Sequence, residues 1–287
     1  MYGSILFPVD GHSSTEQATS QVLNLARAFD AELHTLYVVE STPQLTEDEQ
    51  QLLHDSLEKQ GQRATLAVAE QASELGIETT RHIREGRPYE SILSYVDEQD
   101  IDLVVMPTQA RTDIEQAYLG STTQRVLERA AVPVLAPKPA ETVPDAPFEM
   151  INRVIIPTDG SDGAERAAEQ ALTVAEHFDA DVRVVYVVDT NTYRMQDSDR
   201  SIVGLLKEGG NQAVETIATA AQERNLNVST VVLRGDPFDE ILQYVTGANG
   251  DLIAMGTRGQ SAGQDRVLGS TTARILQRAE IPVLTVT

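Results

Sequence analysis

Short apolar runs alternate along the chain with longer segments in which apolar residues recur at helical spacing. The first run covers residues 4–9. The segment that follows, over residues 14–29, places Ala18, Val22 and Leu25 on one helical face. A short apolar run is typical of a buried strand, whereas apolar residues three or four positions apart are typical of an amphipathic helix. The opening of the chain therefore predicts a strand followed by a helix.

The same alternation continues through the first half of the chain. It predicts strands at residues 4–9, 31–39, 78–84, 102–106 and 132–135, and helices at residues 14–29, 46–75, 88–98 and 121–129. Strands that alternate with helices favour a parallel sheet whose two faces are both covered. The predicted fold class is therefore doubly wound α/β, in which ligands bind beyond the carboxyl ends of the strands.

The second half of the chain repeats the first at a single offset, 159 − 10 = 149 residues. The segment Pro8-Val-Asp-Gly falls on Pro157-Thr-Asp-Gly, and Leu119-Gly-Ser-Thr-Thr falls on Leu268-Gly-Ser-Thr-Thr. Self-similarity at a fixed offset indicates a tandem duplication. Between the copies lies a segment rich in proline, which is typical of an extended linker. We predict a first domain at 1–138, a linker at 139–149 and a second domain at 150–287.

A glycine-rich segment follows the apolar run at residues 251–255. Gly256 and Gly259 come first, and Gly269-Ser270 follows just before the pattern becomes helical again. Glycine lets a backbone approach a phosphate closely and adopt a positive φ, and the first N–H groups of a helix hold anions. No lysine stands where a Walker loop requires one. The segment therefore predicts an anion site, with an ordinary flexible loop as the alternative.

Composition narrows the classes of protein that fit. The chain has 22 basic and 44 acidic residues, a net charge of −22, and its only lysines are Lys59, Lys138 and Lys207. This balance resembles that of halophilic archaeal proteins, in which salt screens charge repulsion; an acidic mesophilic protein is the alternative. The charge argues against nucleic acid as a partner. With no cysteine, no metal-ligand spacing among the histidines and no long apolar run, we expect a soluble cytoplasmic protein without its own metal site.

The motifs together resemble the universal stress protein family. They are a first strand that ends in Pro157-Thr-Asp-Gly, a second that ends in Tyr186-Val-Val-Asp, and the glycines at 256, 259 and 269. The resemblance covers both halves of the chain. It implies two tandem Rossmann-like domains, related to the adenine nucleotide alpha hydrolases, each with a five-stranded parallel sheet. It also implies ATP as ligand, with Mg or Mn bridged by the phosphates.

The same resemblance implies an intramolecular pseudo-dimer of the two domains, with a homodimer of chains also possible. It implies that Asp159, with Pro157 and Thr158 beside it, contacts the ribose or adenine. It also implies that Val187 presents backbone groups to adenine. The residues that it places around the triphosphate are Gly256, Arg258, Gly259, Gly269, Ser270 and Thr271, and Met255 also belongs to the predicted nucleotide site. For Asp159 a second interpretation stays open, because an aspartate at a strand end commonly caps the next helix.

The first domain departs from this pattern. Pro107 replaces Gly256 and Ala110 replaces Gly259, and the loop also carries Asp113 and Glu115. Proline lacks an N–H group, alanine disfavours a positive φ, and carboxylates would repel phosphate. We therefore expect domain 1 to bind ATP poorly or not at all and to serve as the pairing partner of domain 2.

Three functions fit these observations. The leading hypothesis is an ATP-binding stress-response or regulatory protein whose nucleotide site lies in domain 2. The alternatives are an interaction scaffold that binds no nucleotide, and a slow ATPase. The sequence after the first strand does not match the S-G-G-x-D-S motif of related enzymes, and Asp265 is the one candidate general base in the loop. We predict no catalytic residues and at most weak ATP hydrolysis.

Overall fold

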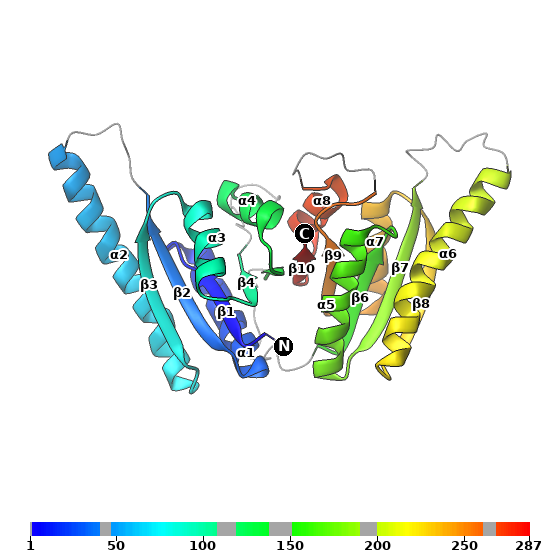
Figure 1. The fold of residues 1–287 in the computed structure, drawn as a ribbon, viewed down its shortest axis with the longest axis horizontal. Helices are drawn as coiled ribbons and strands as arrows, with labels where there is room; N and C mark the ends of the chain where they lie inside the picture. Colours follow the sequence, from blue (N-terminus) through cyan, green and yellow to red (C-terminus); the bar gives the residue numbers. More distant parts are fainter. Residues whose placement is uncertain (1, 41–46, 108–118, 138–150, 190–199, 261–267) are drawn as a thin grey trace. The chain divides into compact units, whose positions relative to one another are not determined.

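The computed structural model describes residues 2–40, 47–107, 119–137, 151–189, 200–260 and 268–287. The chain forms two compact units, Met1–Glu149 (unit 1) and Met150–Thr287 (unit 2). The linker predicted at residues 139–149 lies outside the described residues. Each unit has its own sheet and its own helices (Figure 1).

Strands and helices alternate in unit 1 along its described length. The elements are β1 (Ser4–Pro8), α1 (Ser13–Phe29), β2 (Glu32–Val39), α2 (Glu47–Glu74), β3 (Thr79–Glu85), α3 (Pro88–Glu98), β4 (Leu103–Val105), α4 (Ser121–Arg129) and β5 (Val134–Ala136). Pro88 begins α3 because the first turn of a helix does not need its N–H group. The ends of the predicted elements differ from these by only a few residues.

Unit 2 repeats this order of elements. They are β6 (Arg153–Thr158), α5 (Asp162–Phe178), β7 (Asp181–Asp189), α6 (Arg200–Glu223), β8 (Val228–Gly235), α7 (Pro237–Ala248), β9 (Leu252–Gly256), α8 (Ser270–Arg278) and β10 (Val283–Val286). Asp179 and Asn249, which follow α5 and α7, adopt the left-handed conformation that commonly ends a helix.

In both sheets the strands are parallel, and the order in which successive strands are added reverses once. The strand order is β3-β2-β1-β4-β5 in unit 1 and β10-β9-β6-β7-β8 in unit 2. Successive strands are added on one side of the first strand and then on its other side. The reversal therefore falls between β1 and β4, and between β6 and β9, where doubly wound sheets open a crevice for ligands. The predicted doubly wound parallel fold is confirmed.

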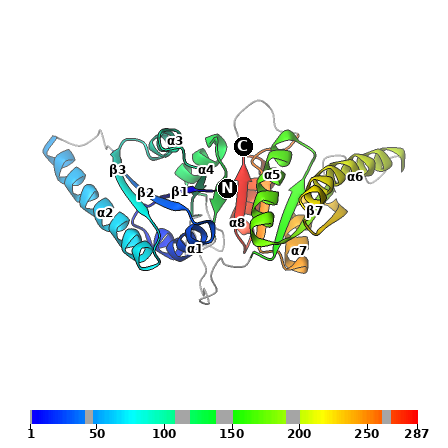
Figure 2. The ribbon, with the colours of Figure 1, turned by 60° about the horizontal axis from the view of Figure 1, so that its bottom comes forward.

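Helices cover both faces of each sheet. Right-handed connections place α1 and α2 on one face of unit 1, and α3 and α4 on the opposite face. In agreement, α1 contacts α2 and α3 contacts α4, and Figure 2 shows the two pairs on opposite sides of the strands. Because both faces are covered, central strands are buried along their length: Ile5, Leu6, Phe7, Val154, Ile155 and Ile156 are each 0% exposed. This burial explains their continuous apolar runs.

Two adjacent glycines in α6 test how closely this helix packs on the sheet. A Cβ atom on Gly210 would lie 2.6 Å from the Tyr186 ring of β7, whereas one on Gly209 would meet no described atom within 4 Å. Gly210→Ala should therefore lower the free energy of unfolding by about 1–3 kcal/mol through overpacking. Gly209→Ala should raise it by about 0.5–1 kcal/mol through helix propensity. Urea denaturation followed by circular dichroism measures both; equal stability of the two variants would contradict the close packing.

Candidate functional site

A cavity opens in unit 2 where the strand order reverses, between β6 and β9. Its volume is about 600 Å³, within the range that small-molecule sites occupy. The carboxyl ends of β6, β7 and β9 form its base, and residues of α6, α7 and α8 form its walls. The cavity therefore lies at the place where doubly wound sheets bind their ligands.

The structure brings all the site residues predicted from the sequence to this one cavity. Those that line it are Pro157, Thr158, Asp159, Val187, Met255, Gly256, Arg258, Gly259, Gly269, Ser270 and Thr271. They come from four separate segments of the chain. Parallel strands bring these segments together because their carboxyl ends share one edge of the sheet.

Asp159 joins the end of β6 to the glycine loop. Its Oδ1 accepts a hydrogen bond from the N–H of Ser161 at 3.1 Å, and its Oδ2 accepts one from the N–H of Gln260 at 2.7 Å. The residue that caps α5 is Ser161, whose Oγ accepts from the N–H of Ala164 at 3.2 Å. The capping interpretation of Asp159 is therefore wrong. Its carboxylate instead holds the loop that follows β9.

Close packing requires the two glycines Gly256 and Gly259, the first against backbone and the second against a side chain. A Cβ atom on Gly256 would lie 2.8 Å from the carbonyl carbon of Gly163, and one on Gly259 would collide with Oδ2 of Asp159. Neither glycine has a positive φ; in this part of the site that conformation belongs to Gly160, with φ 76°. The expectation that Gly256 and Gly259 provide positive φ is therefore wrong. They are small because the loop packs directly on the turn between β6 and α5.

The first turn of α8 faces the cavity, and no side chain of the N-cap residue accepts a hydrogen bond from its N–H groups. Gly269 is the N-cap residue and has no side chain to offer. Its own N–H donates to the carbonyl oxygen of Thr257 at 2.8 Å, and Oγ1 of Thr272 donates to the carbonyl oxygen of Gly256 at 2.9 Å. These bonds fix the start of α8 on the end of β9. Ser270 and Thr271 at this helix start line the cavity, where N–H groups of a first turn can hold an anion.

The walls of the cavity contain residues that the sequence did not single out. Tyr186, Leu206, Pro237 and Ile241 add apolar surface, and Gln260 adds the N–H group that Asp159 binds. Tyr186 is next to Val187, so its position could have suggested it. Leu206 and Ile241 lie on helices far along the chain, and only the tertiary structure brings them here. Among the described lining residues Arg258 carries the only positive charge.

Asp10, the counterpart of Asp159 in unit 1, keeps the bond to the N–H group two residues on and adds a bond to Thr15. Oδ1 of Asp10 accepts from the N–H of His12 at 2.9 Å and from Oγ1 of Thr15 at 2.5 Å, and its Oδ2 lies 3.2 Å from Nδ1 of His12. Both oxygens thus contact the start of α1. Ala110, Asp113 and Glu115 lie outside the described residues, as does Asp265 in unit 2.

Two searches of the described residues bear on other kinds of site. Among the helices that the structure describes, none combines the length and apolarity needed to cross a membrane. In the same ranges, no three His, Asp or Glu side chains gather closely enough to hold a metal ion.

Fold and cavity together define the class of protein: two tandem Rossmann-like α/β domains, the second with a cavity at the point where its strand order reverses. The model of the Universal stress protein family matches residues 1–138 and again residues 150–287. The chain therefore belongs to the universal stress protein family, and both of its halves are members.

Relatives agree with this assignment. A universal stress protein of Methanocaldococcus jannaschii, MJ0531, is 36% identical over 140 residues, which are 48% of this chain and 82% of that protein. YxiE, a universal stress protein of Bacillus subtilis, is 27% identical over 147 residues, 48% of this chain and 99% of its own. The crystal structure of a universal stress protein from Archaeoglobus fulgidus covers 100% of this chain and 99% of its own with a TM-score of 0.76 at 20% identity, which supports the two-domain fold.

Proposed function

We propose that this protein is a cytoplasmic stress-response regulator that binds ATP in unit 2. One observation carries the proposal: a single cavity at the switch point gathers the end of β6, the glycine loop and the start of α8. Each of these supplies a group that a nucleotide needs. The family membership supports a regulatory role, exerted through conformation or interaction.

The cavity offers separate surfaces to the two ends of a nucleotide. Tyr186, Leu206 and Ile241 form an apolar wall against which adenine would pack, with backbone groups of Val187 at its edge. At the other end, Ser270 and Thr271 would direct N–H and hydroxyl groups to the phosphates. Arg258 would add the one positive charge of the described lining.

The close packing of Gly256 and Gly259 fits a phosphate-binding loop, because it holds the loop backbone directly against Gly163 and Asp159. Asp159 would position this loop through Gln260 while its remaining lone pairs face the ribose or adenine. Mg or Mn would be held mainly by phosphate oxygens of the ligand, in keeping with the few acidic groups in the described lining, Asp159 and Asp189.

Unit 1 would act as the pairing partner of unit 2 in an internal pseudo-dimer and would bind ATP poorly. The bond from the Thr15 hydroxyl to Asp10 supports this proposal, since it occupies the carboxylate and has no counterpart in unit 2, where Ala164 stands in place of Thr15. Pro107 supports it too, because a proline cannot donate an N–H group to a phosphate.

The first test is the nucleotide content of the full chain purified in molar salt. We expect one adenine nucleotide per chain after denaturation and chromatography, and ATP binding that strengthens with magnesium. Two nucleotides per chain would contradict the assignment of the site to unit 2 alone. No nucleotide, together with no binding in a titration with ATP and magnesium, would favour the interaction scaffold. Release of phosphate in the same sample would indicate a slow ATPase.

A further inference from the structure

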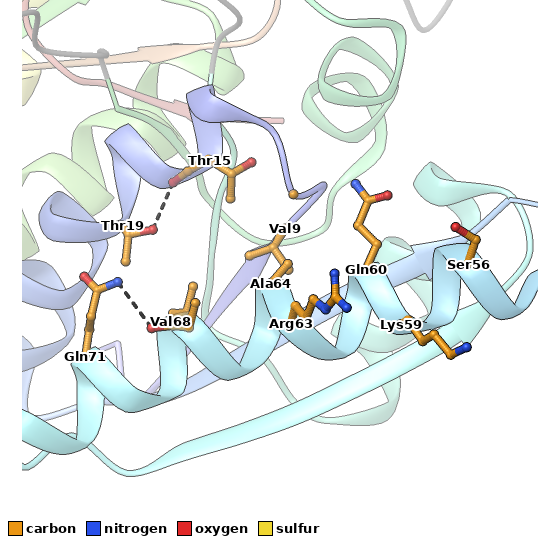
Figure 3. Close-up of a pocket in the computed structure, with 12 residues that line it drawn as sticks. Val9, Thr15, Thr19, Ser56, Lys59, Gln60, Arg63, Ala64, Val68 and Gln71 are labelled. Atoms are coloured by element: carbon orange, nitrogen blue, oxygen red, sulfur yellow. Dashed lines mark hydrogen bonds between the residues drawn. The ribbon is translucent and has the colours of Figure 1, made fainter.

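A second cavity, of about 650 Å³, lies in unit 1 between α1 and α2. Thr15 and Thr19 of α1 form one wall, and α2 forms the other along the stretch from Ser56 to Gln71 (Figure 3). Of its lining residues, only Val9 and Thr15 have counterparts, Thr158 and Ala164, that line the cavity of unit 2. The rest of the lining, most of it along α2, has no counterpart there, so this cavity adjoins the place of the unit 2 site and extends away from it along α2.

The cavity concentrates positive charge in a strongly acidic chain. Lys59 and Arg63, one turn apart on α2, both line it, although the chain has only 22 basic residues against 44 acidic ones. Both side chains are exposed, and neither forms an ion pair with any described residue. Elsewhere in unit 1, Arg84 and Arg87 are paired with glutamates. Two unpaired cations at one cavity are thus available to an external anion.

The fold itself does not require this lining, because unit 2 lacks it. At the offset of 149 residues, Lys59 corresponds to Glu208 and Arg63 to Gln212, while Thr15 and Thr19 correspond to alanines 164 and 168. Unit 2 has the same two helices in the same places. The cationic and hydroxyl groups are therefore specific to unit 1.

The rest of the lining is apolar or accepts hydrogen bonds. Val9 and Val68 are each 4% exposed and, with Ala64, supply apolar surface. The buried hydroxyl of Thr19 donates to the carbonyl oxygen of Thr15 at 3.0 Å, and Nε2 of Gln71 donates to that of Ala67 at 3.2 Å. The hydroxyl donor of Thr19 and one of the two N–H donors of Gln71 are thus used within the protein, and the oxygens of both side chains remain able to accept.

These surfaces are arranged along α2 in a definite order. Figure 3 shows Ser56 and Lys59 toward one end of the cavity and Thr19 and Gln71 toward the other, with Arg63, Val9 and Ala64 between. Lysine and arginine together are suited to phosphate, the first as a point charge and the second as a planar fork of donors. We propose that this cavity of unit 1 binds a small organic phosphate: a phosphate monoester held at Lys59 and Arg63, with its apolar part on Val9, Ala64 and Val68.

The test is calorimetric titration of the full chain with phenyl phosphate in the presence of saturating ATP. Lys59→Glu/Arg63→Gln, which installs the residues of unit 2, should weaken binding at least about tenfold, because it removes two charge-assisted contacts. Lys207→Glu/Arg278→Gln changes the net charge equally at exposed positions outside the cavity and should bind like the parent. Equal binding by the two double variants would overturn the proposal. So would binding that is seen only without ATP, or no binding by the parent at millimolar phenyl phosphate.

A second pair of variants tests the position of the ligand along α2. Ala67→Glu places a carboxylate at an exposed residue of the lining, whereas Leu66→Glu places it next door, at a leucine that is 43% exposed and outside the lining. The first should abolish binding of phenyl phosphate, and the second should leave it within about twofold of the parent. Inorganic phosphate should bind more weakly than phenyl phosphate, because it lacks the apolar part. Equal effects of the two glutamates, or equal affinities of the two phosphates, would contradict the site.

Discussion

Replacing Gly256 with alanine should lower the free energy of unfolding of unit 2 by about 2–3 kcal/mol and abolish the nucleotide binding that we propose for this unit. The added Cβ would lie 2.8 Å from the carbonyl carbon of Gly163 and 3.1 Å from the nitrogen of Ala164. Both neighbours are backbone atoms at the start of α5, so no side chain can rotate away to relieve the contact. Either the end of β9 or the turn after β6 has to move.

Gly247→Ala is the matched control for this variant. A Cβ atom on Gly247, in α7, would meet no described atom within 4 Å, so alanine should raise stability by about 0.5–1 kcal/mol. Urea denaturation of the two variants and the parent measures the difference, and chromatography of denatured samples measures the nucleotide. A Gly256→Ala protein with parental stability and one nucleotide per chain would show that β9 and α5 do not pack as described.

Replacing Gly259 with alanine should change the free energy of unfolding little but weaken ATP binding strongly. Its Cβ would collide with Oδ2 of Asp159, the atom that accepts from the N–H of Gln260. A carboxylate at the end of a side chain can rotate away, so stability should change by less than about 1 kcal/mol. The bond between β6 and the glycine loop would be lost, and ATP affinity should fall at least about tenfold because the loop no longer holds its position.

A double-mutant cycle separates this mechanism from a general effect on the loop. Asp159→Ala removes the atom with which the alanine at position 259 collides. If the effect passes through Asp159, adding Gly259→Ala to Asp159→Ala should lower ATP affinity little further. Fully additive losses would show that Gly259 acts independently of Asp159.

The fold could be predicted from sequence because its signals are local and repeated. Runs such as Ser4–Pro8 and Leu252–Gly256 are apolar at every position because central strands of a covered parallel sheet are buried on both faces. The offset of 149 residues supplied each element twice, so ambiguity in one half was reduced by the other. Helix ends were less certain, since Ser13 and Glu47 begin helices one residue from the predicted positions.

The sequence predicted the residues of the candidate site that follow the strand ends and begin α8, but not the residues of its apolar wall or the contacts within it. Carboxyl ends of parallel strands meet at one edge, so Asp159, Val187 and Gly256 had to come together once the strand order was known. Hydrogen bonds between them depend on distances of a few tenths of an ångström. The sequence could not show that Asp159 binds Gln260 while Ser161 caps α5.

The sequence by itself therefore determined the duplication, the doubly wound parallel sheets and those residues of the unit 2 cavity that lie in its motifs, because periodicity and motif spacing are local properties of the chain. Only the tertiary structure decided why Gly256 and Gly259 are glycines, which helices supply the apolar wall, and that Lys59 and Arg63 line a cavity between α1 and α2. These features depend on which surfaces of distant elements face each other. Packing decides that relation, and no pattern within a single segment contains it.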